Sequence, residues 1–153
     1  MLLCIVPVSA LADDTALRSV AVQNIGPNEA AIDTDLYEKM SAGINPIKLI
    51  ADINLYSTLS ISQEVIIDLN GHVLKMTGSG SVFKVEKGGH LTIIDSNPEA
   101  VHKFTPNADD LWVLDETNGT KTVNGGVITG GTGSSIGISV YGGGVYVDGG
   151  GTF

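Results

Sequence analysis

Hydrophobic and polar residues alternate along most of the chain beyond Pro46. Every second position between residues 47 and 55 is apolar, and residues 59–61 and 65–69 continue this alternation. A period of two is typical of a strand that buries one face. Further segments of strand length follow, separated by turns rich in glycine, serine or asparagine: 73–76, 82–85, 91–94, 111–114, 127–129, 136–141 and 145–147. The pattern therefore predicts an all-β domain of many short strands.

One short helix is predicted before the strands, over residues 34–42. Leu36 and Met40 are four residues apart and form a small apolar face, while Asp33 is a candidate N-cap and Gly43 a candidate C′ residue. A helix of this length is not stable alone, so we expect it to pack on the strands. No second segment has a helical period, which excludes a doubly wound α/β sheet.

Internal similarity favours a solenoid among the all-β folds. The segment Ile66-Ile67-Asp68 recurs as Ile93-Ile94-Asp95, and residues 83–91 are similar to residues 145–153. Repeats of unequal length are typical of a solenoid, in which loops of variable size connect stacked strands. Asp68 and Asp95 are expected at equivalent, outward and solvated positions of neighbouring coils. The helix over 34–42 can then cover the open end of the first coil.

A known superfamily shares several of these segments. Residues 49–55, 59–61 and 65–74, with the run Asp68-Leu69-Asn70-Gly71-His72, resemble the opening coils of bacterial secreted and surface proteins of the pectin-lyase-like superfamily, and so do the Gly-rich segments 125–131 and 142–147. The resemblance implies a right-handed parallel β-helix over residues 33–153, with a helical cap at 34–42 and an inserted loop at 96–122. It also implies that the β-helix is incomplete at the C-terminal end and that further coils follow Phe153.

The N-terminal segment predicts export. Residues 1–12 carry no charge and end in Ala10-Leu11-Ala12, which matches the apolar region and cleavage site of a signal peptide. A short buried apolar strand is the alternative interpretation. Residues 13–32 are then an extended lead-in, and we expect a secreted or cell-surface protein. The apolar run is too short to span a bilayer as a helix, so no transmembrane segment is predicted in the mature chain.

Charge and cysteine content exclude several classes of function. The net charge is -9 and Arg18 is the only arginine, so no basic surface is available for nucleic acid. Cys4 is the only cysteine and would leave with the signal peptide. The mature chain would therefore have no disulfide bond and no thiolate nucleophile.

Catalytic and metal-binding motifs are missing from the predicted coils. For a pectate lyase, the resemblance implies a calcium-bridged cluster of carboxylates and an arginine or lysine base. No arginine is present on the coils, and the coil lysines do not match the pattern of such an active site. The glycine-rich segment 130–136 is close to a calcium-binding repeat but has Ser135 where an aspartate is needed. His72, His90 and His102 lack metal-binding spacing. We therefore predict no catalytic residue, no metal site and no cofactor, and calcium binding has no supporting motif.

The candidate ligand-binding residues lie in the segment that interrupts the repeats. It contains the only tryptophan and a cluster of acids, namely Asp109, Asp110, Trp112, Asp115 and Glu116. A tryptophan beside carboxylates can stack on a sugar ring while the acids bind its hydroxyl groups. The alternative is that residues 111–114 form one more strand and that Trp112 fills the core.

The sequence thus predicts a noncatalytic β-helix scaffold, secreted or on the cell surface. It would act as an adhesin, a wall component or a glycan-binding protein, with a polysaccharide or cell-wall glycan as its partner. The alternative is the N-terminal part of a polysaccharide lyase or glycoside hydrolase whose catalytic coils lie outside this chain.

Overall fold

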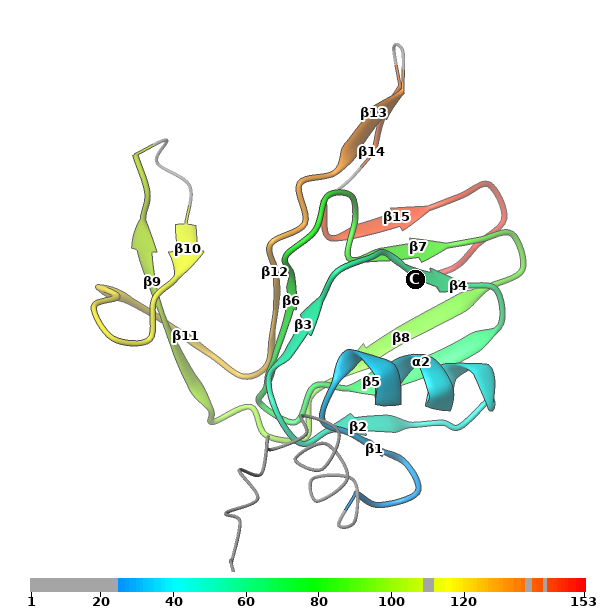
Figure 1. Cartoon of the computed structure of the whole chain (residues 1–153), viewed down its shortest axis with the longest axis horizontal. Coiled ribbons are helices and arrows are strands. Elements are labelled where there is room, and N and C mark those ends of the chain that lie inside the picture. Colours follow the sequence, from blue (N-terminus) through cyan, green and yellow to red (C-terminus); the bar gives the residue numbers. More distant parts are fainter. Residues whose placement is uncertain (1–24, 109–111, 137–138, 142) are drawn as a thin grey trace, which may run out of the picture.

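Short strands recur in three groups of three, and their pairing produces three parallel sheets (Figure 1). The computed structural model describes residues 25–108, 112–136, 139–141 and 143–153. The groups are β2 (Ile47–Leu49), β3 (Ile53–Leu55) and β4 (Leu59–Ile61); β5 (Glu64–Asp68), β6 (Val73–Met76) and β7 (Phe83–Val85); and β8 (His90–Ile94), β12 (Val127–Thr129) and β15 (Val145–Val147). The prediction of a mostly β structure is confirmed.

Each strand of the second group lies between its counterparts in the first and third groups. The parallel sheets have the orders β2-β5-β8, β3-β6-β12 and β4-β7-β15. Another short strand, β1 (Glu29–Ala30), pairs with β2. The chain therefore visits all three sheets before it returns to the first. Corresponding side chains align in register, as Leu59, Phe83 and Val145 do.

The aligned apolar side chains form one continuous core. Side chains on the inward face of the first two groups are buried: Ile47, Leu49, Ile53, Leu55, Leu59, Ile61, Val65, Ile67, Leu74, Met76, Phe83 and Val85. Each buried side chain of this size stabilises the fold by about 1.5–3 kcal/mol relative to an exposed one. Burial decreases in the third group, where Val145 is half-buried and Val147 is exposed, because β12 and β15 pair with a strand on one side only among the described residues.

Two of the predicted strands differ from the structure. The strand predicted over 47–55 is interrupted at 50–52, where Asp52 Oδ1 accepts a hydrogen bond of 2.9 Å from the N–H of Val73. The strand predicted over 136–141 is a hairpin of β13 (Ser134–Ile136) and β14 (Ser139–Tyr141). The segments that flank the hairpin approach so closely that a Cβ on Gly131 would lie 1.7 Å from the Gly143 carbonyl oxygen. Glycine at this position permits the contact.

The predicted helix is confirmed as α2 (Asp33–Ser41). Its Leu36 and Met40 side chains are buried against the first strands, as the spacing predicted. The helix begins one residue earlier than expected, with Ile32 rather than Asp33 at the N-cap position. Gly43 has φ of 68° and its N–H donates to the Met40 carbonyl oxygen, so it ends the helix as predicted. Figure 1 shows α2 at the end of the sheets where the chain enters, and the helix contacts β1, β2 and β3.

The inserted segment is not a loop but a separate antiparallel sheet. It consists of β9 (Val101–Pro106), β10 (Trp112–Leu114) and β11 (Lys121–Asn124), in the order β10-β9-β11. Phe104 of β9 packs with Val73 and Val127 in a second apolar cluster. We call this unit the antiparallel sheet. It projects from the side of the sheet that contains β6 and β12 (Figure 1).

Several predictions fall outside the described residues. The signal peptide over 1–12, most of the lead-in, and the candidates Asp109 and Asp110 lie there. Within the described part of the chain, no helix is long and apolar enough to cross a bilayer.

Candidate functional site

The antiparallel sheet meets the parallel sheets at a corner built from carboxylates and backbone groups. Asp68 is 6% exposed, and its Oδ1 accepts hydrogen bonds from the N–H groups of Asn70 (2.9 Å) and Ser96 (2.8 Å). The prediction that Asp68 and Asp95 are equivalent, solvated residues is therefore wrong. The strand register places Asp68 opposite Ile94, so that Asp95 lies one residue further on.

Asp95 binds three backbone segments at this corner. Its Oδ1 accepts hydrogen bonds from the N–H groups of Gly71 (2.7 Å) and Asn97 (3.2 Å), and its Oδ2 accepts one from Gly126 (2.6 Å). Burial alone would raise the pKa of Asp95, but these hydrogen bonds and the nearby His102 outweigh it and lower the pKa. Asp95 is therefore an ionised structural residue that joins both ends of the antiparallel sheet to the second strand group.

Gly71 lies where these segments converge. It has φ of 75°, a conformation that side chains with a Cβ rarely adopt. A Cβ at this position would lie 2.6 Å from the Cβ of Ala100 and 3.0 Å from the Asn97 carbonyl oxygen. Glycine is thus required both by the turn and by the close approach of the chain that leads into β9.

His102 is a buried polar residue of this corner that the sequence did not single out. It is 7% exposed, its Nε2 lies 2.9 Å from the Gly71 carbonyl oxygen, and its Nδ1 lies 2.7 Å from Glu116 Oε1. Burial alone would lower the pKa of His102, but Glu116, the Gly71 carbonyl and the more distant Asp52 raise it overall. The alternation over 101–106, with His102 and Phe104 on one face, is the sequence signal that could have indicated its burial.

The predicted ligand-binding residues have different environments. Trp112 lies on β10 and is 51% exposed, so the alternative in which it fills the core is wrong, although residues 112–114 are a strand. Asp115 Oδ1 accepts hydrogen bonds from the N–H groups of Thr117 and Asn118 in a turn. Glu116 binds His102 and accepts a bond from the N–H of Lys103. The structure thus assigns internal roles to these two acids and leaves the tryptophan at the surface.

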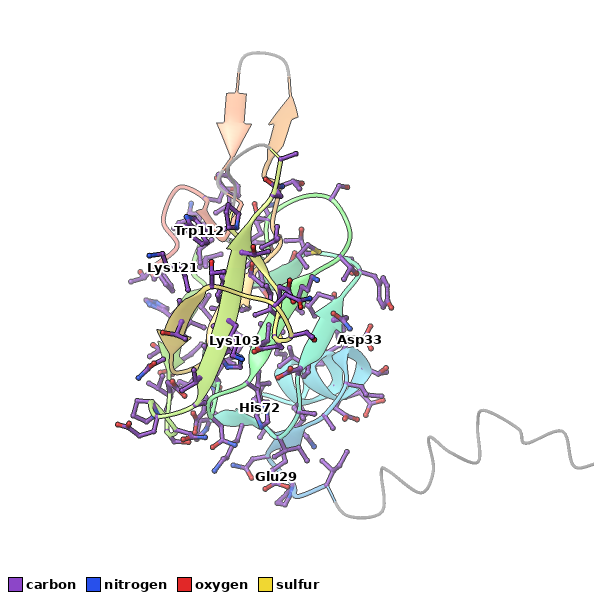
Figure 2. The ribbon with its side chains drawn as sticks, turned by 90° about the vertical axis from the view of Figure 1, so that its left-hand side faces the viewer. Glu29, Asp33, His72, Lys103, Trp112 and Lys121 are labelled. Atoms are coloured by element: carbon purple, nitrogen blue, oxygen red, sulfur yellow. The ribbon has the colours of Figure 1, made fainter. Side chains whose placement is uncertain are left out.

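The indole of Trp112 is exposed and lies beside a proline. In the strand register Trp112 is opposite Pro106, at the outer end of the antiparallel sheet, and the adjacent Val113 is 40% exposed on the other face. Figure 2 shows Trp112 towards the outer end of this sheet, with Lys103 and Lys121 further along it. An exposed indole on a strand has little conformational freedom and offers a flat apolar surface to a ligand.

No site for a metal ion is formed by the described residues. None of their histidine, cysteine and acidic side chains gather in groups of three that could hold one. His72 Nδ1 lies 3.4 Å from Asp52 Oδ1, in a pair near the start of β6. The glycine-rich segment 130–136 leads into the β13–β14 hairpin, and the N–H groups of Thr132 and Gly133 donate to the Gly80 carbonyl oxygen.

A hollow of about 300 Å³ lies between α2 and the strands. Its lining contains hydroxyl, amide and apolar side chains but no charged one: Tyr37, Met40, Ser41, Ser60, Ser62, Gln63 and Val65. Two of its polar groups fasten the helix, since Gln63 Nε2 donates to the Met40 carbonyl oxygen (2.7 Å) and Tyr37 Oη bonds to Ser57. The hollow offers no pair of carboxylates for acid–base catalysis.

Comparisons with protein-family models, with curated proteins and with solved structures give no match for this chain.

Proposed function

We propose that the three parallel sheets are the three faces of a right-handed parallel β-helix of the pectin-lyase-like kind. The order of the strands supports this, because each group of three passes through the sheets in the same sequence. Thr152 also forms a parallel bridge to His90, which extends the first sheet by one more position. Parallel strands connected through other strands favour the right-handed crossover. The antiparallel sheet is then an insertion between the first and second faces of the third coil.

We further propose that the protein is a noncatalytic scaffold, secreted or on the cell surface, that binds glycans through the surface around Trp112. The observation that carries this proposal is the half-exposed indole of Trp112 on an ordered strand. Exposed aromatic rings at the outer end of a supported element are typical of binding surfaces. Asp115 and Glu116 stabilise the antiparallel sheet, so among the described candidates the Trp112 ring is the group left to contact a ligand. The uncharged segment over residues 1–12 supports export.

Replacing Trp112 by alanine is expected to weaken glycan binding about tenfold, because stacking on an aromatic ring contributes about 0.5–1.5 kcal/mol beyond its buried area. Binding of the whole chain to a panel of cell-wall and plant polysaccharides, followed by calorimetry on the best ligand, measures this change. Tyr56→Ala is the matched control, since Tyr56 is an exposed aromatic residue (73%) remote from the antiparallel sheet. It should leave the affinity unchanged.

Two outcomes would contradict the proposal. If Trp112→Ala binds glycan as tightly as the unmodified chain, the surface around Trp112 is not the binding site. If the purified chain releases unsaturated or reducing sugars from polygalacturonate or related glycans, the protein is an enzyme and not a noncatalytic scaffold.

A further inference from the structure

The ring nitrogens of His102 both face hydrogen-bond acceptors. A backbone carbonyl oxygen can only accept, and so can an ionised carboxylate. The Gly71 carbonyl oxygen is 2.9 Å from Nε2 and Glu116 Oε1 is 2.7 Å from Nδ1. Neutral imidazole carries a single N–H and can satisfy only one of them. The arrangement therefore requires the imidazolium form, with a proton on each nitrogen.

The two acceptors belong to different parts of the fold. Gly71 is in the turn between β5 and β6 of the parallel stack, whereas Glu116 follows β10 in the antiparallel sheet. His102 itself is on the central strand β9. Because the Gly71 N–H donates to Asp95, the Gly71 carbonyl oxygen that accepts the hydrogen bond from His102 Nε2 is fixed in place. The protonated ring thus joins the antiparallel sheet to a rigid corner of the stack.

We propose that His102 is a pH-dependent latch, which fastens the antiparallel sheet to the parallel stack when both ring nitrogens are protonated and releases it when one proton is lost. Release follows because the remaining proton stays on Nδ1, where the carboxylate of Glu116 is the stronger acceptor, so that Nε2 faces the lone pairs of the Gly71 carbonyl oxygen. The remaining attachments are the connecting chain, the hydrogen bonds that Asp95 accepts at the corner, and the packing of Phe104 against Val73 and Val127. The inference deepens the proposed function, on which its biological use rests, because the same sheet carries Trp112.

Other charged groups near the ring set the direction of the pH dependence. Glu116 contacts His102 directly, and Asp95 and Asp52 act on it from the corner of the stack. His72 lies beside Asp52 in the same corner. The facing residue on β11 is the apolar Val123. Negative groups therefore predominate around His102, and they favour its charged form.

The sign of the effect follows from the raised pKa of His102. A pKa that is higher in the folded chain than in the unfolded chain stabilises the folded form below the unfolded value, which is about 6.5 for histidine. This contribution is lost as the pH rises through the folded pKa. The latch is therefore closed in mildly acidic solution and opens towards alkaline pH.

The whole chain is tested between about pH 5 and about pH 9, the range that brackets histidine titration. Amide exchange over 101–106, corrected for the intrinsic effect of pH, should lose protection roughly tenfold as His102 deprotonates. The strands from β2 to β7 should keep their protection. Fluorescence of Trp112, the only tryptophan, should change over the same pH range. NMR titration should show a pKa of His102 above the ordinary histidine value of about 6.5.

Variants identify the titrating group. Glu116→Gln should move the transition to lower pH, since the amide keeps an acceptor but removes the negative charge. His102→Gln should abolish the transition, whereas His72→Gln and His90→Gln should leave it unchanged. If His102→Gln does not fold, the shift of the transition in Glu116→Gln and the NMR titration of the unmodified chain test whether His102 is the titrating group.

Protection that is independent of pH, or a transition that persists in His102→Gln, would overturn the latch. Failure of the proposed function is distinguishable from failure of the latch. If the chain binds no glycan but shows the pH transition, the proposed function is wrong and the latch stands. If it binds glycan through Trp112 but shows no transition, the latch is wrong and the proposed function stands.

Discussion

Replacing Phe83 by alanine is expected to lower the free energy of unfolding by about 3–5 kcal/mol, the usual cost of removing a buried aromatic ring. Phe83 is 0% exposed on β7, the strand between β4 and β15. Its neighbours in the ladder are Leu59 and Val145, so truncation leaves a cavity that both sides border. Urea unfolding followed by far-UV circular dichroism measures the loss.

Phe153→Ala is the matched control for this prediction. Phe153 is 65% exposed, so the same change in side chain should cost less than about 0.5 kcal/mol. Equal losses for the two variants would mean that Phe83 does not lie in the core between the three sheets.

Replacing Asp95 by alanine should destabilise the chain by about 3 kcal/mol, because three backbone N–H groups lose their acceptor at once. The donors are those of Gly71, Asn97 and Gly126. Asp95→Asn retains one carbonyl oxygen and should cost less. Asp148→Ala is the control, since Asp148 is an exposed aspartate that accepts a single hydrogen bond, from the adjacent Gly149.

The acid dependence of stability gives a second measure of Asp95. Its pKa is lower in the folded chain than in the unfolded chain. Its contribution is therefore present above the unfolded value, about 3.9 for aspartate, and is lost as the pH falls through the folded pKa. The destabilisation caused by Asp95→Ala should accordingly shrink in acid. A cost that is the same at neutral and acid pH would show that the charge of Asp95 is not involved.

Local patterns in the sequence predicted the helix and most strands of the parallel sheets, but not β9 and β11. Leu36 and Met40 are buried at their helical spacing, and Ile53 and Leu55 are buried at a spacing of two. The bend at 50–52 was not predicted, because it depends on a bond from Asp52 to Val73, 21 residues later. An alternating pattern indicates which side chains face inward but not where the chain changes from one sheet to the next.

The candidate site was only partly predictable, because it also depends on contacts between residues that are far apart in the sequence. Trp112 was singled out by its residue type, and its exposure agrees with a binding role. Glu116 was chosen as a ligand-binding acid, yet its partner is His102, on the other side of the β9–β10 connection. His102 in turn depends on the carbonyl of Gly71, 31 residues earlier. Spacing along the chain does not predict pairs of this kind.

The stacking of the three strand groups is tested most directly by NMR on the isotopically labelled chain. We predict contacts between amide and α protons that connect Ile61, Val85 and Val147 in one parallel ladder, as the register of β4, β7 and β15 requires. Parallel neighbours lack the close approach of facing α carbons that marks antiparallel pairs. Strong contacts between α protons along β7, or pairing of β7 with β6 as a hairpin, would contradict the proposed β-helix.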